Sequence, residues 1–104
     1  MIRDLEELKQ TIKQKLNSIK FHPHFYDSLK KRPYLNQEFV ISCLGEFDDY
    51  LGFQTHEVRG SIRYRLGISL SKKYVLVVVL EINESLNIVT AWKTNRKWQK
   101  AIQK

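Results

Sequence analysis

The sequence predicts an α+β fold in which two or three N-terminal helices pack on a twisted, mainly antiparallel sheet of four strands. Apolar residues recur every three or four positions up to about residue 45, as on the buried face of a helix, and then follow strand-like patterns. The connections between the expected strands are short, which favours antiparallel neighbours. The chain has 104 residues, of which 42% are hydrophobic, and only two are proline, so we expect residues 1–104 to form a single domain.

The first element is an amphipathic helix, predicted over residues 1–20. Its apolar positions are three or four apart: Ile2, Leu5, Leu8, Ile12, Leu16 and Ile19. Acidic residues occupy its first turns and lysines its later turns, in the sense that the helix dipole favours.

Two shorter helices are predicted next. The second helix begins near Pro23, because proline suits the first turn of a helix, and Pro33 ends it. The third helix follows Asn36, which is a good N-cap. Gly45 stands where a left-handed C-cap is expected.

Four strands are predicted after Gly45. They are marked by Phe53 and Thr55, by the alternation of residues 62–68, and by residues 74–82 and 88–92. Residues 74–80 are apolar on both faces, which is typical of a central strand covered on both sides. Trp98 and Ile102 are four apart, which predicts a short C-terminal helix over residues 95–104.

The net charge of +7 indicates a polyanion as partner, and this charge is localised. Residues 35–57 contain five acidic side chains and no Lys or Arg, whereas residues 58–75 and 87–104 each contain five Lys or Arg and no acid. The single cysteine, Cys43, is typical of a core thiol and agrees with a reducing compartment. Neither a signal peptide nor an apolar run of 18 residues is found, so we expect a cytoplasmic protein that binds no membrane.

Histidine and arginine side chains are the candidates for a functional site. Arg63 and Arg65 are two apart on a predicted strand, so they leave the face opposite Tyr64 and could bind phosphate oxygens in pairs. The alternative is that they are solvated charges on an open sheet. His24 could act as a general acid or base, or only as a polar cap at a helix start. His56, beside Glu57 on an expected strand, is a weaker candidate.

The C-terminal stretch 92–98 also combines suitable side chains. It interleaves aromatic with basic and hydroxyl groups, a mixture that can stack bases and hold phosphates. Trp98 could equally belong to the core. His22 and His24 have no spaced Cys, Asp or Glu near them, so we expect neither a metal nor another cofactor.

Residues 24–34 resemble the helix motif H-A-x-x-R-M-x-x-R-G-I of a small family grouped with the RelE/ParE-like toxins. Three positions fall on the family's His, Met and second Arg: His24, Leu29 and Arg32. Two positions depart from the motif, with Ser28 in place of its first Arg and Pro33 in place of its Gly.

Further segments resemble the same family in the same order. They are its short acidic-hydrophobic helix at residues 37–40, its basic strand at 62–65, and its closing strand with a terminal Thr-x-Arg at 88–96. The likeness spans roughly residues 21–98, which leaves the first helix and a basic tail at residues 99–104 outside it.

The resemblance implies the fold of RelE-like toxins and barnase-like ribonucleases, in which the open face of the sheet binds RNA. It also implies a toxin of a toxin–antitoxin pair that acts as a metal-independent endoribonuclease. The partners would be RNA, including ribosome-bound mRNA, and an acidic protein antitoxin. Two alternatives remain open, a non-catalytic module that binds nucleic acid or protein on the same fold and a toxin that poisons gyrase.

Cleavage of RNA by its own 2′-hydroxyl requires a base, an acid and cations that neutralise the phosphorane. Under this hypothesis the catalytic residues are His24, Arg65 and Arg96. The residues expected to bind RNA or phosphate are Arg32, Arg63, Lys93, Thr94, Tyr64 and Trp92.

Overall fold

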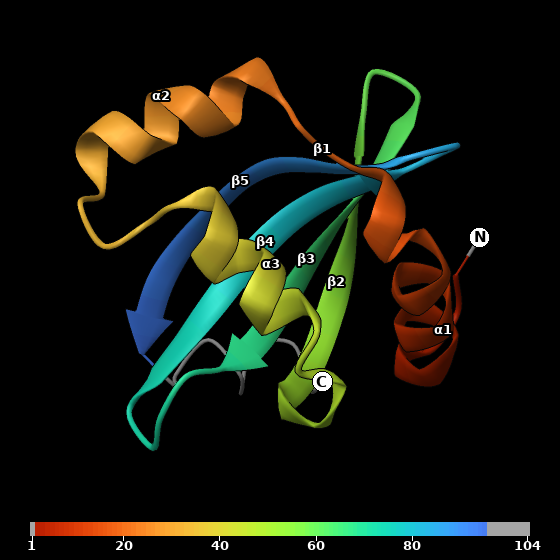
Figure 1. Ribbon diagram of the computed structural model, residues 1–104. Helices are drawn as coiled ribbons and strands as arrows, with labels where there is room; N and C mark the ends of the chain where they lie inside the picture. The colour runs from red at the N-terminus through yellow and green to blue at the C-terminus, as the bar shows by residue number, and fades with distance from the viewer. Residues whose placement is uncertain (1, 96–104) are drawn as a thin grey trace.

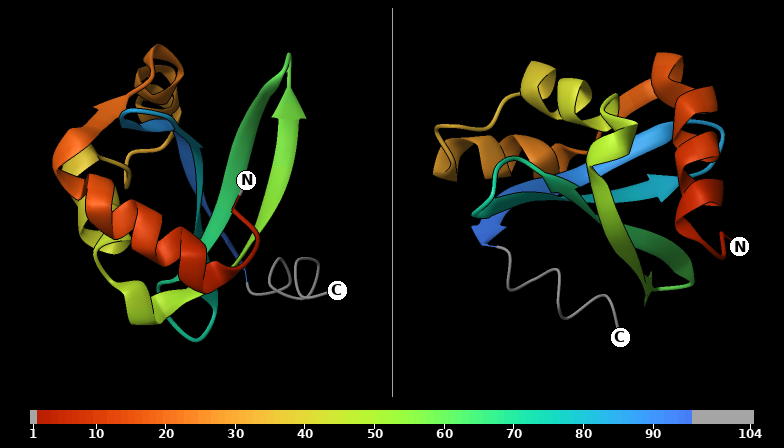
Figure 2. Two further views of the ribbon diagram at one scale, coloured as in Figure 1. Left: turned by 90° about the vertical axis from the view of Figure 1, so that its right-hand side faces the viewer. Right: turned by 90° about the horizontal axis from the view of Figure 1, so that it is seen from below.

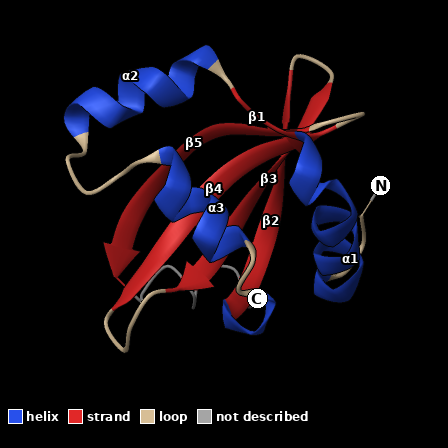
Figure 3. Cartoon of the chain, in the orientation of Figure 1, coloured by secondary structure: helices blue, strands red, loops and turns tan. Residues whose placement is uncertain are grey.

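A computed structural model describes residues 2–95 and confirms the α+β class (Figure 1). Its helices are α1 (Leu5–Lys15), α2 (Pro23–Lys31) and α3 (Gln37–Leu44), with 3-10 turns at Leu16–Ser18 and Phe47–Asp49. Its strands are β1 (Ile19–Phe21), β2 (Tyr50–Val58), β3 (Ser61–Ser69), β4 (Tyr74–Ile82) and β5 (Leu86–Asn95). The three helices precede the four long strands along the chain, and Figure 3 distinguishes the helices from the strands by colour. The C-terminal helix predicted over residues 95–104 lies outside the described residues except at its first position.

The sheet has five strands in the order β1-β5-β4-β3-β2, so the predicted number of four was wrong. Strands β2 to β5 are antiparallel neighbours, as predicted, whereas β1 pairs parallel to β5. The extra strand takes Ile19 from the predicted first helix, which ends at Lys15. Three residues are too few to display an alternation, and Ile19 also fits the helical spacing, so the strand could not be read from the pattern.

Side-chain caps mark the starts of α1 and α3, and only the cap of α3 was predicted. Asp4 accepts a hydrogen bond from the backbone N–H of Glu7, so α1 begins at residue 5 rather than residue 1. The Asn36 side chain accepts one from the N–H of Phe39 and caps α3, as predicted. Gly45 is not left-handed, because its φ is −79° and its N–H continues the helical bonding to the carbonyl of Ile41.

Helices α1 and α3 cover one face of the sheet, and α2 lies along the edge of the sheet at β5 (Figure 2). Their apolar side chains form one core with alternate residues of the strands, and the largest buried contributors are Leu8, Ile12, Phe25, Leu44, Leu66, Leu76, Leu80 and Ile88. Strand β4 lies between β3 and β5 and is buried from Val75 to Leu80, which confirms it as the central apolar strand. The opposite face carries none of the described helices. None of those helices is long and apolar enough to cross a membrane.

Two local features of the sheet shape this open face. A two-residue turn joins β2 to β3, with Arg59 at φ 50° and Gly60 at φ 82°, which is the geometry of a tight type I′ hairpin. The second is an irregularity in the β4–β5 register, where Leu80 pairs with Ile88 but Val79 pairs with Thr90. Val89 is therefore the extra residue of a β-bulge.

Candidate functional site

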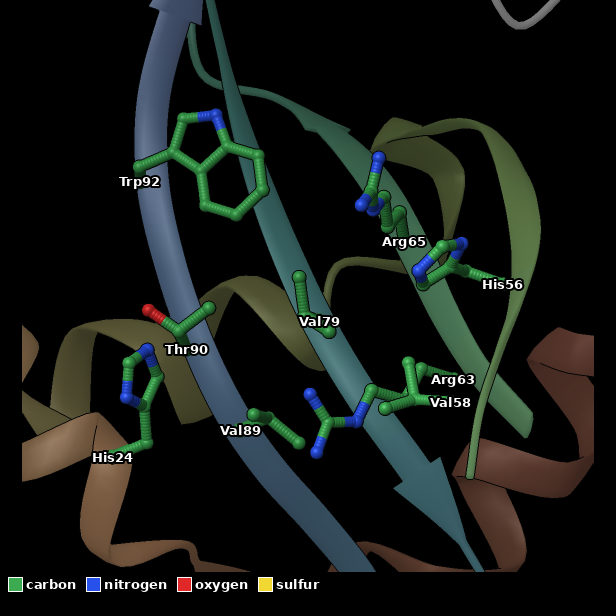
Figure 4. A pocket seen from close by; sticks show the side chains of 9 residues that line it. All are labelled: His24, His56, Val58, Arg63, Arg65, Val79, Val89, Thr90 and Trp92. Atoms are coloured by element: carbon green, nitrogen blue, oxygen red, sulfur yellow. The ribbon is translucent and has the colours of Figure 1, made fainter. Parts of the chain in front are cut away.

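A groove with a volume of about 210 Å³ lies on the open face of the sheet (Figure 4). Its lining comes from α2 and all four long strands: His24, His56, Val58, Arg63, Arg65, Val79, Val89, Thr90 and Trp92. The groove therefore brings together four residues that the sequence predicted for the site: His24, Arg63, Arg65 and Trp92. The groove is formed only by the folded sheet, because its lining residues span positions 24 to 92.

His24 reaches the groove because α2 is fixed along the outer edge of β5. The buried side chain of Ser28 contacts Thr90 with 2.6 Å between the two hydroxyl oxygens, and it also donates to the carbonyl of His24. One turn earlier, Phe25 is fully buried and packs on Phe21, with ring centroids 4.6 Å apart. These contacts hold the first turn of α2, so the exposed imidazole of His24 lies beside Thr90 (Figure 4).

His22 has a different task from His24. Its Nδ1 accepts a hydrogen bond from the backbone N–H of His24 and thereby caps the start of α2. His22 is absent from the lining of the groove, so the capping role weighed for a histidine at this helix start belongs to His22.

Arg63 and Arg65 leave the open face, while Tyr64 between them lies in the core, as the alternation predicts. The Nε of Arg63 donates to the Glu81 carboxylate of β4 at 2.7 Å, and the two side chains are 29% and 26% exposed. Figure 4 shows the outer nitrogens of the Arg63 guanidinium turned toward Val89 in the groove. Glu81 therefore orients Arg63 and also neutralises its charge.

Arg65 is the less compensated cation of the groove. It is half-buried, and its side chain forms neither an ion pair nor a hydrogen bond within the described range 2–95. Figure 4 places it beside His56, across β4 from His24. His24 and His56 thus lie on opposite sides of Val79, and the guanidinium groups of Arg63 and Arg65 line the same groove.

His56, the weaker histidine candidate from the sequence, also lines the groove. It pairs with Arg63 across the β2–β3 ladder, so both side chains emerge on the same face. The sequence could have placed His56 opposite Arg63, because a two-residue turn at Arg59-Gly60 fixes the register of β2 against β3.

Apolar side chains form the floor and one wall of the groove. Val79 and the bulge residue Val89 lie at its base, and the half-buried indole of Trp92 forms a wall further along β5. An indole in this position can stack on a nucleic-acid base, as proposed for Trp92 from the sequence.

Two of the predicted RNA-binding residues point away from the groove. Tyr64 is 5% exposed and packs against Phe53 in the core, so its prediction as a base-stacking surface was wrong. Lys93 lies on the helix-covered face, where its ammonium group is 5.1 Å from the ring centre of Tyr34 and 4.9 Å from that of Tyr74. The prediction that Lys93 contributes to the same site as Arg65 is therefore also corrected.

The remaining predicted residues lie near the groove or outside the described range. Thr94 is half-exposed and, like Lys93, is not part of the groove lining. Arg32 is the C-cap of α2 and lines a smaller hollow that shares His24 with the groove. Arg96 and Trp98 lie outside the described residues.

The buried cysteine is separate from this site. Burial, with smaller contributions from Asp49 and Glu46, raises the pKa of the Cys43 thiol above its ordinary value. The thiol therefore stays protonated and inert at neutral pH, in agreement with its prediction as a core residue. Within residues 2–95, no three His, Cys, Asp or Glu side chains cluster in a way that could hold a metal ion.

Comparison with protein-family models, with curated proteins and with solved structures finds no match to this chain. The resemblance to the RelE/ParE-like toxins therefore rests on its short motifs alone.

Proposed function

We propose that this protein is a RelE-like toxin that cleaves RNA in the groove by attack of the 2′-hydroxyl. The observation that supports it best is the convergence of His24, Arg65 and Trp92, which come from three separate elements, on one open sheet face. Side chains of these three types supply proton transfer, phosphate binding and base stacking.

The proposed chemistry divides between the two sides of β4. One imidazole, that of His24 or His56, removes the proton of the 2′-hydroxyl, and the other protonates the departing 5′-oxygen. The bond from the 2′-oxygen to phosphorus forms as the bond to the 5′-oxygen breaks, which leaves a 2′,3′-cyclic phosphate. Arg65, supported by Arg63, stabilises the charge that develops on the phosphorane oxygens.

The partners under this proposal are RNA, including mRNA on the ribosome, and an acidic protein antitoxin. The groove carries Arg63 and Arg65 against no carboxylate in its own lining, which suits a polyanionic strand. Expression in bacteria should arrest growth, and co-expression of an acidic neighbouring gene product should relieve the arrest.

The test is cleavage of end-labelled RNA, both free and in a translating bacterial extract, with the ends mapped at nucleotide resolution. His24→Ala and Arg65→Gln should each lower the rate by about 10²- to 10³-fold. His22→Asn removes an imidazole two residues from His24 but keeps an N-cap, and Lys13→Gln removes an exposed charge from α1, so both should retain activity. Full cleavage by His24→Ala would overturn the assignment.

The ion pair at Arg63 favours a second candidate, a non-catalytic module that binds nucleic acid. Because Glu81 neutralises Arg63, the groove has weaker phosphate stabilisation than two uncompensated arginines would provide. A module should lose affinity gradually with each basic residue removed and with rising salt, whereas an enzyme should lose turnover abruptly at His24. Inhibited supercoiling with intact RNA would instead indicate a gyrase poison.

A further inference from the structure

A second, smaller hollow adjoins the groove at His24. It has a volume of about 80 Å³ and is lined by His24, Asp27, Ser28, Lys31 and Arg32. The Ser28 hydroxyl in this hollow contacts the Thr90 hydroxyl in the groove, with 2.6 Å between the oxygens. The two depressions are therefore neighbours on the surface and share His24.

The hollow has a net positive charge. Lys31 and Arg32 contribute two cations, and Asp27 contributes one carboxylate. Among the residues that the structure describes, none of these three side chains forms an ion pair. The two cations are thus available to an external anion, and Asp27 weakens but does not cancel their attraction.

The helix dipole explains only part of this arrangement. Lysines in the last turn of α2, Lys30 and Lys31, are favoured by the partial negative charge at the helix C-terminus. The dipole does not explain why Lys31 and Arg32 line one hollow together with the candidate catalytic residue His24. Lys30 lies in the same turn but does not line the hollow. Replacing Lys30 therefore tests the helix-dipole effect alone, whereas replacing Lys31 also tests binding in the hollow.

We propose that this hollow is a second phosphate subsite, which binds a backbone phosphate adjacent to the one in the groove. The ligand is single-stranded nucleic acid, and the proposal rests on the proposed function of the groove. Arg32 and Lys31 bind the phosphate oxygens through charge-assisted hydrogen bonds. The substrate therefore runs from Trp92 past His24 toward the C-terminal end of α2, and strands with more than one phosphate bind more tightly.

The test measures binding of a fluorescein-labelled 2′-deoxy octanucleotide, with an unlabelled 2′-deoxy dinucleotide as competitor. Neither probe can be cleaved through a 2′-hydroxyl, so binding is read independently of turnover. Lys31→Gln and Arg32→Gln should each raise the octanucleotide Kd roughly three- to tenfold, as expected for the loss of one phosphate contact, and leave the dinucleotide Ki unchanged. Asp27→Asn should lower the octanucleotide Kd, and Lys30→Gln should change it less than about twofold.

The lower Kd expected for Asp27→Asn excludes a purely structural effect, because damage to α2 would not tighten binding of the octanucleotide. If Arg65→Gln weakens both probes but the Lys31 and Arg32 variants weaken neither, the subsite is overturned and the groove stands. If the Lys31 and Arg32 variants weaken the octanucleotide but Arg65→Gln weakens neither probe, the subsite stands and the proposed function of the groove fails. An octanucleotide that does not bind at all would overturn both.

Discussion

Replacing Glu81 with glutamine tests whether the groove acts as a phosphate site. The Glu81 carboxylate accepts a hydrogen bond from Nε of Arg63 at 2.7 Å. Within residues 2–95, Glu81 is the acidic residue that forms an ion pair with this guanidinium. Glutamine keeps an oxygen that can accept from Nε but removes the charge. Arg63 thus keeps its orientation while the groove gains one unit of positive charge.

The size of the effect follows from the repulsion that is removed. A carboxylate and a phosphate on either side of one guanidinium are roughly 7 Å apart, where unit charges repel by about 0.6 kcal/mol in water and about 2.4 kcal/mol at an effective dielectric constant of 20. Both side chains of the pair are more than a quarter exposed, so solvent screening favours the lower part of this range. We expect about 1 kcal/mol, which is about a fivefold lower Kd for single-stranded RNA.

The assay is fluorescence anisotropy of a labelled RNA across a series of salt concentrations. The slope of log Kobs against log salt should steepen by up to about 0.7 for Glu81→Gln, because one more phosphate is neutralised, and it should become shallower by a similar amount for Arg65→Gln. Glu38→Gln, on the helix-covered side of the molecule, removes the same charge away from the groove and serves as control. Unchanged or weaker binding by Glu81→Gln, with Arg65→Gln weakened, would refute the reasoning.

Three further predictions concern stability and reactivity. The buried Tyr50 hydroxyl donates to the Leu44 carbonyl at 2.6 Å, and Tyr50→Phe should cost about 1–3 kcal/mol in chemical denaturation because it leaves this acceptor unpaired. Burial raises the Tyr50 pKa, so its stabilising contribution is complete below about pH 10 and is lost above it as the unfolded chain ionises; the pH dependence of unfolding should therefore be weaker in Tyr50→Phe. Cys43 should react with a disulfide reagent at least about tenfold more slowly in the native protein than in denaturant, and equal rates would contradict its burial. Gly60→Ala should lower the free energy of unfolding by about 1 kcal/mol, because φ is 82° there, whereas Ser61→Ala beside it should cost less.

Much of the fold could be predicted from local patterns. Helical spacing, the Asn36 cap and the strand alternation each depend on a few neighbouring residues, and these predictions were confirmed. β1 could not be predicted, because its three residues form a strand only by pairing with Leu86–Ile88. Gly45 also departs from the left-handed conformation that was predicted for it at the helix C-cap. Its φ is −79°, and its backbone N–H continues the hydrogen bonding of α3.

The candidate site was predictable only in part for the same reason. Alternation correctly placed Arg63 and Arg65 on the face opposite Tyr64. The aromatic character of Tyr64 suggested base stacking, but the same alternation buries it. Trp92 and Lys93 are neighbours on β5, so their side chains leave opposite faces and could not both line the groove. The bulge at Val89, which no local signal marks, determines that Trp92 is the one that faces it.

The contact between α2 and β5 also determines when the groove can form during synthesis. The groove needs residues from position 24 to position 92, and the contact between Ser28 and Thr90 that holds α2 links parts of the chain 62 residues apart. The hairpins β2–β3, β3–β4 and β4–β5 can form from neighbouring segments, but α2 has its place only after β5 exists. During synthesis the groove therefore stays incomplete until β5 has been made, although His24 and the rest of α2 are among the first parts of the chain to emerge.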